Sequence, residues 1–175
     1  LYHSYVSFLA APNLYGWAMV QPLPEGDFQW ESERDADTLI DRYADNPERG
    51  CFVKCDLHYP KELHDSHNDY PLAPERKLVT QEMLSPYASE LQQQLKIGRD
   101  VSEKLVPNLE DKTDYVVEIR NLKFYRDHGL KITKVSKVIS FRQSTWMKPY
   151  IEFNTEMRKK AKNEFEKDFH KLMCN

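Results

Sequence analysis

The segment Leu130–Phe141 constrains the fold most, because its apolar and polar residues alternate with one slip near Val138. This two-residue period is typical of a half-exposed β-strand, whereas an amphipathic helix repeats about every 3.6 residues. The polar side of the segment carries Lys131, Lys134 and Lys137. We therefore predict a strand with a basic solvent side that can approach phosphates, although solvated surface lysines explain the same pattern.

Other segments predict a mixture of strands and helices, so the expected fold class is α+β. Strands are expected where β-branched, aromatic or alternating residues gather: 2–9, 51–60 and 115–119. Helices are expected between capping residues and breakers: 35–43, 85–95 and 121–128. The segment 21–26, with two prolines and a glycine, is predicted to be a turn-rich break, and 61–76 a polar surface loop without a helical face.

A short helix is expected directly after the strand 2–9. Asn13 is a favourable capping residue, and Leu14-Tyr15-Gly16-Trp17 follows it. A strand that ends in such a turn presents its last residues to solvent, where a site could lie. The alternative is an ordinary core strand and its turn.

The distribution of charge points to an anionic partner. The net charge is -3, but residues 120–171 hold 14 basic and 6 acidic residues, a local balance of +8. Such a segment favours DNA, single-stranded or primer-template, with affinity that falls as salt rises. A composition that is 40% hydrophobic argues against disorder throughout, and no apolar run is long enough for a membrane span, so no membrane partner is expected.

The cysteine and histidine residues leave a metal site open as an alternative. Cys51, Cys55, His58, His64 and His67 are the usual types of zinc ligand at short spacings. No Cys-x-x-Cys pair is present, and solvated histidines explain the pattern more simply. Three cysteines are too few for a disulfide framework, which favours an intracellular location, nucleus or cytoplasm.

Two consecutive helices are predicted at the carboxy-terminal end, over 146–153 and 155–173. The second has apolar residues at every fourth position, a spacing that predicts a stripe packed in the core: Met157, Ala161, Phe165 and Phe169. On a continuous helix, Lys160, Lys167 and Lys171 would point within roughly 40° of one another. These lysines are candidates for phosphate contact, with a solvated face beside Glu164 as the alternative.

The residues Asn13-Leu14-Tyr15-Gly16 resemble the first palm motif of family B DNA polymerases of the protein-primed branch, which phages, linear plasmids and mobile elements carry. That motif reads Asp-x-x-(Ser or Asn)-Leu-Tyr-(Pro or Gly). The resemblance implies that Leu14 and Tyr15 lie at the nucleotide, with Tyr15 packed under the incoming sugar. Ala10 stands where the family has its metal-binding Asp.

The family requires Mg²⁺, and Ala10 changes what this chain can do. A methyl group cannot ligate a metal ion, and phosphoryl transfer by two metals depends on carboxylates that hold them about 3.5–4 Å apart. We therefore expect no intact catalytic residue and no metal ligand in this chain, and little or no activity.

The residues Lys171-Leu172-Met173-Cys174-Asn175 resemble the start of the second motif of the same family, Lys-x-x-x-Asn-Ser-x-Tyr-Gly, on the fingers helix. The resemblance implies that Lys171 contacts the triphosphate and that Asn175 borders the nascent base pair. Through the neighbouring block 148–151, Arg158 is the best match to a second triphosphate-binding cation of the family, and Lys167 is a weaker one. Arginine suits that role because its planar fork binds phosphate oxygens in pairs.

Blocks between the two motifs, 59–65, 67–75 and 83–87, are similar to the same polymerases. The resemblance implies palm entry over 1–24, an insertion over 25–140 that contacts a terminal protein primer and DNA, and fingers helices over 141–175. It also implies that the chain is part of a larger polypeptide, with the aspartates of the third motif beyond Asn175. The expected function is DNA-directed DNA synthesis from dNTPs; the alternative is a non-catalytic relic that binds nucleic acid or a protein.

Overall fold

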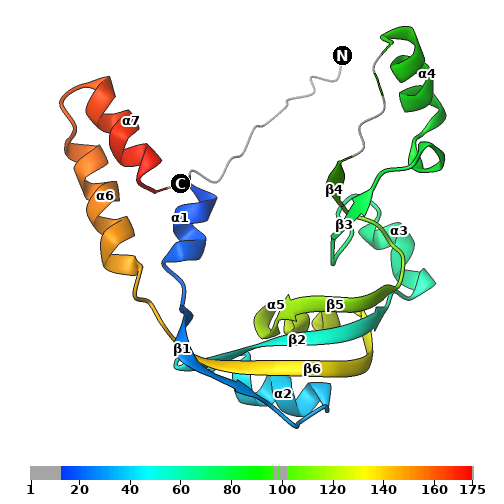
Figure 1. Ribbon diagram of the computed structural model, residues 1–175, viewed down its shortest axis with the longest axis horizontal. Coiled ribbons are helices and arrows are strands. Elements are labelled where there is room, and N and C mark those ends of the chain that lie inside the picture. Colours follow the sequence, from blue (N-terminus) through cyan, green and yellow to red (C-terminus); the bar gives the residue numbers. More distant parts are fainter. Residues whose placement is uncertain (1–12, 97, 99–101, 175) are drawn as a thin grey trace, which may run out of the picture.

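A four-stranded antiparallel sheet forms the base from which the other parts of the molecule project (Figure 1). The computed structural model describes residues 13–96, 98 and 102–174, so the strand predicted over 2–9 lies outside the described residues. Across the sheet the order is β1 (Leu23–Trp30), β6 (Lys131–Ser144), β2 (Arg49–His58) and β5 (Lys112–Glu118). The long alternating strand is therefore β6, and it lies between β1 and β2.

One face of the sheet is covered by α2 (Ala36–Tyr43) and α5 (Ile119–Asp127), which also contact each other. Every second residue of β2 is buried against these helices, as the two-residue period of a strand requires. The core contains the following side chains, each at most 2% exposed: Leu39, Ile40, Cys51, Val53, Cys55, Leu57, Ile119, Leu122 and Val138. The fold is therefore α+β, as predicted, with both helices on the same side of a curled antiparallel sheet.

The chain leaves the sheet between β2 and β5 and forms an arm with α4 far from the sheet (Figure 1). Its elements are η1 (Lys61–Leu63), α3 (His64–His67), β3 (Glu75–Leu78), η2 (Gln81–Met83), α4 (Pro86–Gln94) and β4 (Glu103–Val106). Strands β3 and β4 pair with each other. At their base Lys112 is 1% exposed and its ammonium group lies 3.3 Å from Glu75, so a buried ion pair joins the arm to the sheet.

Three helices lie together on the side of the sheet where β1 begins and β6 ends (Figure 1): α1 (Leu14–Met19), α6 (Lys148–Lys160) and α7 (Glu164–Leu172). Helices α6 and α7 pack side by side as a hairpin, and α1 contacts α6. The two ends of the described chain, more than 150 positions apart, therefore meet in space.

The prediction of a turn-rich break over 21–26 is wrong, because β1 begins at Leu23 and continues through Pro24 and Gly26. Strand β1 lies at the edge of the sheet, where proline is tolerated because only one side of the strand is paired. The pairing with β6 shifts register between Pro24 and Gly26, and such irregularities accommodate both residues.

The prediction of a loop without helices over 61–76 is also wrong, since η1 and α3 occupy 61–67. These short helices have no strong local helix signal, and contacts with the rest of the protein stabilise them. Leu63 packs against the core, and the rings of His64 and His67 meet Tyr59 edge to face, each at 5.7 Å. Tertiary contacts therefore hold these short turns.

The boundary between the two carboxy-terminal helices was predicted near 154, but α6 runs to Lys160 and the break is at 161–163. Asn163 caps α7: its side-chain oxygen accepts a 2.9 Å hydrogen bond from the Glu166 amide. The predicted stripe is thereby split between two helices and is not buried, because Met157, Phe165 and Phe169 are 37%, 80% and 48% exposed.

The domain boundaries expected from the resemblance fall inside strands. The limit at 24/25 lies within β1 and the limit at 140/141 lies within β6. In the structure the sheet extends from Leu23 to Ser144, and the helical hairpin follows it.

Candidate functional site

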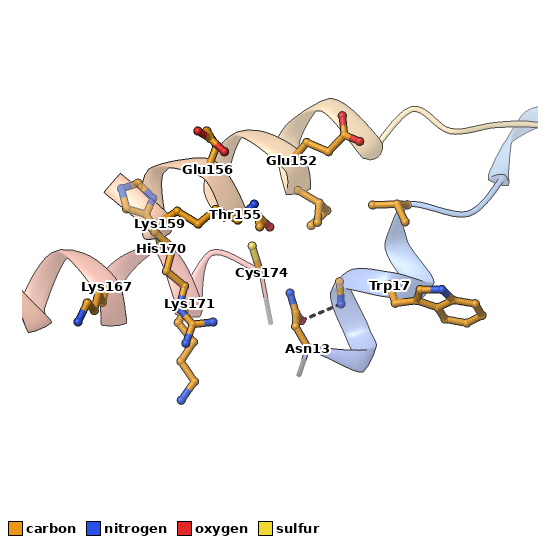
Figure 2. A pocket seen from close by; sticks show the side chains of 14 residues that line it. Asn13, Trp17, Glu152, Thr155, Glu156, Lys159, Lys167, His170, Lys171 and Cys174 are labelled. Carbon is orange, nitrogen blue, oxygen red and sulfur yellow. Dashed lines mark hydrogen bonds between the residues drawn. The ribbon is translucent and has the colours of Figure 1, made fainter. Parts of the chain in front are cut away.

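A cavity of about 1120 Å³ lies between α1 and the α6–α7 hairpin (Figure 2). It is open to solvent and is formed by both ends of the described chain. The lining residues are Asn13, Gly16, Trp17, Val20, Ile151, Glu152, Thr155, Glu156, Arg158, Lys159, Lys167, His170, Lys171 and Cys174.

The turn before α1 forms one wall of the cavity. Asn13 has a left-handed backbone, φ 71°, which asparagine tolerates better than most residues. Its side-chain oxygen accepts a 2.9 Å hydrogen bond from the Gly16 amide, so Asn13 caps the helix as predicted. In Figure 2, Asn13 and Cys174 lie on facing sides of the space between α1 and the end of α7.

The opposite wall is positioned by a buried polar contact between α6 and α7. Asn154 is 3% exposed, donates to the Tyr150 carbonyl at 3.0 Å, and its side-chain oxygen lies 3.0 Å from His170 Nδ1. Because a buried amide needs hydrogen-bond partners, this contact favours the observed orientation of α7 on α6. In this orientation Lys167 and Lys171 line the cavity.

Cations dominate the cavity wall. Among the ion pairs of the described residues, none involves Arg158, Lys159 or Lys171, while Lys167 pairs with Glu164 at 2.6 Å. The two acidic side chains of the lining, Glu152 and Glu156, point away from α1 and α7 in Figure 2. Glu156 pairs instead with Lys160 at 3.2 Å. Three cations without ion-pair partners among the described residues attract an anion such as a phosphate.

Only some of the residues predicted from the first motif line the cavity. Gly16 and Asn13 line the cavity, but Leu14 and Tyr15 do not; the two side chains are 61% and 73% exposed on α1. Ala10 lies outside the described residues. The sequence motif therefore contributes its turn to the cavity wall, whereas the Tyr15 side chain is not part of the lining.

Most of the residues predicted from the second motif and its surroundings lie at the same cavity. Arg158, Lys167 and Lys171 all line the cavity. Lys160 does not, because the break at 161–163 separates α6 from α7 and removes the common helical face expected for the lysines. Asn175 lies outside the described residues.

The three lysines predicted on the long strand lie away from this cavity. Lys131 and Lys134 line a smaller cavity of about 420 Å³, which Arg34 and Arg126 also line. Lys137 is exposed in β6 and stands opposite Lys54 of β2. The lysines named as candidates for phosphate contact are therefore divided between the helical hairpin and the sheet.

Sequence reasoning missed Lys159, His170 and Cys174 as lining residues. Their inclusion depends on where α6 ends and how α7 turns back. One signal was present: Asn163 followed three positions later by Glu166 resembles a capping box and marks the start of a new helix.

The residues considered for zinc are not brought together. Cys51 and Cys55 face the core, where burial raises the pKa of each thiol to about 12, so neither is poised to bind a metal as a thiolate. His58 bonds to Asp111, and His67 bonds to the Tyr59 hydroxyl. Within residues 13–96, 98 and 102–174, no group of three metal-ligating side chains is present.

Comparisons with protein families, with curated proteins and with solved structures find no match to this chain. In the part of the chain that the structure describes, no helix has the length and apolar character needed to cross a bilayer.

Proposed function

We propose that this chain is the palm-to-fingers portion of a protein-primed family B DNA-directed DNA polymerase, and that its cavity receives the triphosphate of a dNTP. The observation that carries the proposal is a meeting of distant residues. Arg158 and Lys171 line the same cavity as Gly16, more than 140 positions earlier in the sequence. Both motifs that resemble the polymerase family contribute to this one cavity.

The chemistry of the wall suits a triphosphate. The guanidinium group of Arg158 can bind two phosphate oxygens at once, and the ammonium groups of Lys159 and Lys171 add compact charge. A cavity of about 1120 Å³ is large enough for a nucleotide. By the resemblance, Tyr15 would gate the sugar, Asn175 would border the base pair, and residues 25–140 would contact the primer-template or a terminal protein.

The donor groups at the cavity do not fit the Mg²⁺ ions that the family uses. Ala10 offers no ligand atom, and the carboxylates of Glu152 and Glu156 point away from the cavity. We therefore assign no metal-dependent step to this chain. Its proposed contribution is to bind and orient the triphosphate.

Binding of dATP to the purified chain, followed by isothermal titration calorimetry, tests the cavity. Arg158→Ala and Lys171→Ala should each weaken binding about tenfold or more, the loss expected for a charge-assisted contact. The matched control is Lys160→Ala, a lysine of the same helix as Arg158 that does not line the cavity. Equal affinity in all four proteins would refute the proposed site.

A non-catalytic relic that binds nucleic acid or a protein is the second candidate, and Ala10 is the observation that favours it. Primer extension by the full-length protein distinguishes the two. Synthesis that appears when Ala10→Asp is introduced supports a disabled polymerase. If neither form extends a primer while dATP still binds the cavity, the relic is supported.

A further inference from the structure

The sheet face opposite α2 and α5 carries side chains that the core does not use. Because Cys51, Val53 and Cys55 point to the core, the residues between them in β2 point to the other face. Phe52 and Lys54 are therefore on this open face. By their register, so are the residues paired with them in β6, Ile139 and Lys137.

A row of aromatic side chains crosses the open face. Trp30 of β1 pairs with Ile139 of β6, which pairs in turn with Phe52 of β2, and the aromatic residues are 72% and 38% exposed. Beside this row, Phe28 is 58% exposed and its ring lies 6.0 Å from that of Phe141. The buried Phe141 ring also lies 5.2 Å from Phe52, so it supports both neighbours from between them.

Cations stand beside the aromatic row. Lys54 and Lys137 are direct cross-strand partners two positions from Phe52 and Ile139, or about 7 Å along the strands. Like charges directly opposite each other repel. Lys54 pairs with Asp114 at 2.8 Å, the same carboxylate lies close enough to Lys134 and Lys137 for them to lower its pKa, and Asp56 of β2 stands opposite Lys134. These carboxylates offset part of the repulsion, and an added anion would offset more of it.

We propose that the open face of the sheet binds a single strand of nucleic acid, with bases stacked on Trp30 and Phe52 and phosphates near Lys137. Stacking requires base faces that are free of a second strand, and exposed aromatic rings beside lysines provide both halves of such a site. A purely apolar protein partner would bury the charged side chains of this face, which is costly. The proposal rests on the sheet alone and does not depend on the polymerase assignment.

Fluorescence anisotropy with a labelled oligothymidine of about 12 nucleotides tests the proposal on the whole chain. Trp30→Ala and Phe52→Ala should each weaken binding about tenfold, and Trp30→Phe should restore most of the affinity. Lys137→Glu should weaken binding and reduce its dependence on salt. The control is Trp146→Ala, an exposed tryptophan outside the sheet, which should bind as the unmodified chain does.

Circular dichroism and thermal melting establish that these variants fold, which their exposed positions favour. The proposal is overturned if the unmodified chain fails to bind the oligonucleotide at low salt, if Trp30→Ala binds equally well, or if a blunt duplex binds as tightly. Loss of self-association in the same variants, without oligonucleotide binding, would assign the face to protein contact and also overturn it. Titration with dATP reports on the cavity and oligonucleotide binding reports on the sheet face, so failure of one and failure of the other are distinguishable.

Discussion

Asn13 and Gly16 form a matched pair at the start of α1. The Asn13 side-chain oxygen accepts a 2.9 Å hydrogen bond from the Gly16 amide, and a Cβ added to Gly16 would lie 2.2 Å from Asn13 Nδ2. Only glycine therefore leaves room for the capping side chain. The pair sets the turn that forms one wall of the cavity.

Replacement of this glycine should open the first turn of α1. In Gly16→Ala the added methyl group displaces the Asn13 side chain and removes the cap, a loss of about 1 kcal/mol for the local helix. Amide hydrogen exchange of residues 16–19 should accelerate about fivefold, the factor that corresponds to this energy. Asn13→Asp keeps the acceptor oxygen and should exchange like the unmodified chain; unchanged exchange in Gly16→Ala would contradict the pairing.

Gly50→Ala should lower the stability of the sheet. A Cβ at Gly50 would lie 2.7 Å from the ring of Phe141 and 2.7 Å from Gln143 Oε1, and Phe141, at 1% exposed, has little room to move. Overpacking of this kind costs about 1–3 kcal/mol. Urea denaturation measures the loss. Gly98→Ala is the control, because its Cβ would meet nothing within 4 Å; equal midpoints for the two variants would argue against the packing described.

Lys112→Met should be strongly destabilising. The ammonium group donates to the carbonyls of Asn108 and Glu110 at 3.3 and 2.7 Å and pairs with Glu75 at 3.3 Å. Removal of the ammonium group leaves Glu75 with only the more exposed Lys77, at 3.2 Å, as a counter-charge and leaves the two carbonyls without this donor, at a combined cost on the order of 3 kcal/mol. The free energy of unfolding in urea is the measurement.

The matched control for the buried lysine is Lys123→Met. Lys123 forms an exposed pair with Asp127 on α5 at 3.0 Å, and such pairs contribute roughly 0.5 kcal/mol or less. If Lys112→Met were no more destabilising than this control, the ion pair at the base of the arm would not be what joins it to the sheet.

Acid should weaken the fold through Glu31. Hydrogen bonds from the Ser140 and Tyr43 hydroxyls, at 2.6 and 2.8 Å, lower the pKa of the Glu31 carboxyl below its usual value. A lowered folded-state pKa means that the carboxylate stabilises the fold above its unfolded pKa, near 4.3, and that this stability is lost as pH falls through the folded value.

Ser140→Ala tests this linkage. It removes the hydrogen bond that lowers the pKa of Glu31 most. The loss of unfolding free energy should therefore be greatest at neutral pH, and the difference from the unmodified chain should shrink below about pH 4. Urea denaturation at pH 7 and pH 3 measures both differences. Ser66→Ala, which removes an exposed hydroxyl bonded to the Leu63 carbonyl, should give a difference independent of pH.

Arg158→Lys should separate bidentate recognition from charge alone. Lysine keeps the positive charge but lacks the planar fork, so dATP affinity should lie between those of the unmodified chain and Arg158→Ala. Titration calorimetry at one salt concentration measures the series. If the Arg158→Lys variant binds dATP as tightly as the unmodified chain does, the residue acts only as a point charge, and a triphosphate contact through paired hydrogen bonds is excluded.

Much of the local structure was predictable because its causes lie within a few residues. Asn13, Asp35 and Ser85 cap the helices that were expected after them, and Gly129, with φ 98°, ends α5. The alternation in β6 correctly predicted a strand with exposed lysines. Capping, left-handed backbone and side-chain alternation depend on neighbouring residues, so the sequence expresses them directly.

The tertiary structure alone decided the strand order, the helices of the arm and the composition of the cavity. Pro24 and Gly26 suit β1 only because that strand lies at an edge. Arg158, Lys159 and Lys171 share a wall because α7 folds back on α6, where Asn154 meets His170. Contacts between residues far apart in the chain depend on packing as a whole, which no local period or capping signal records.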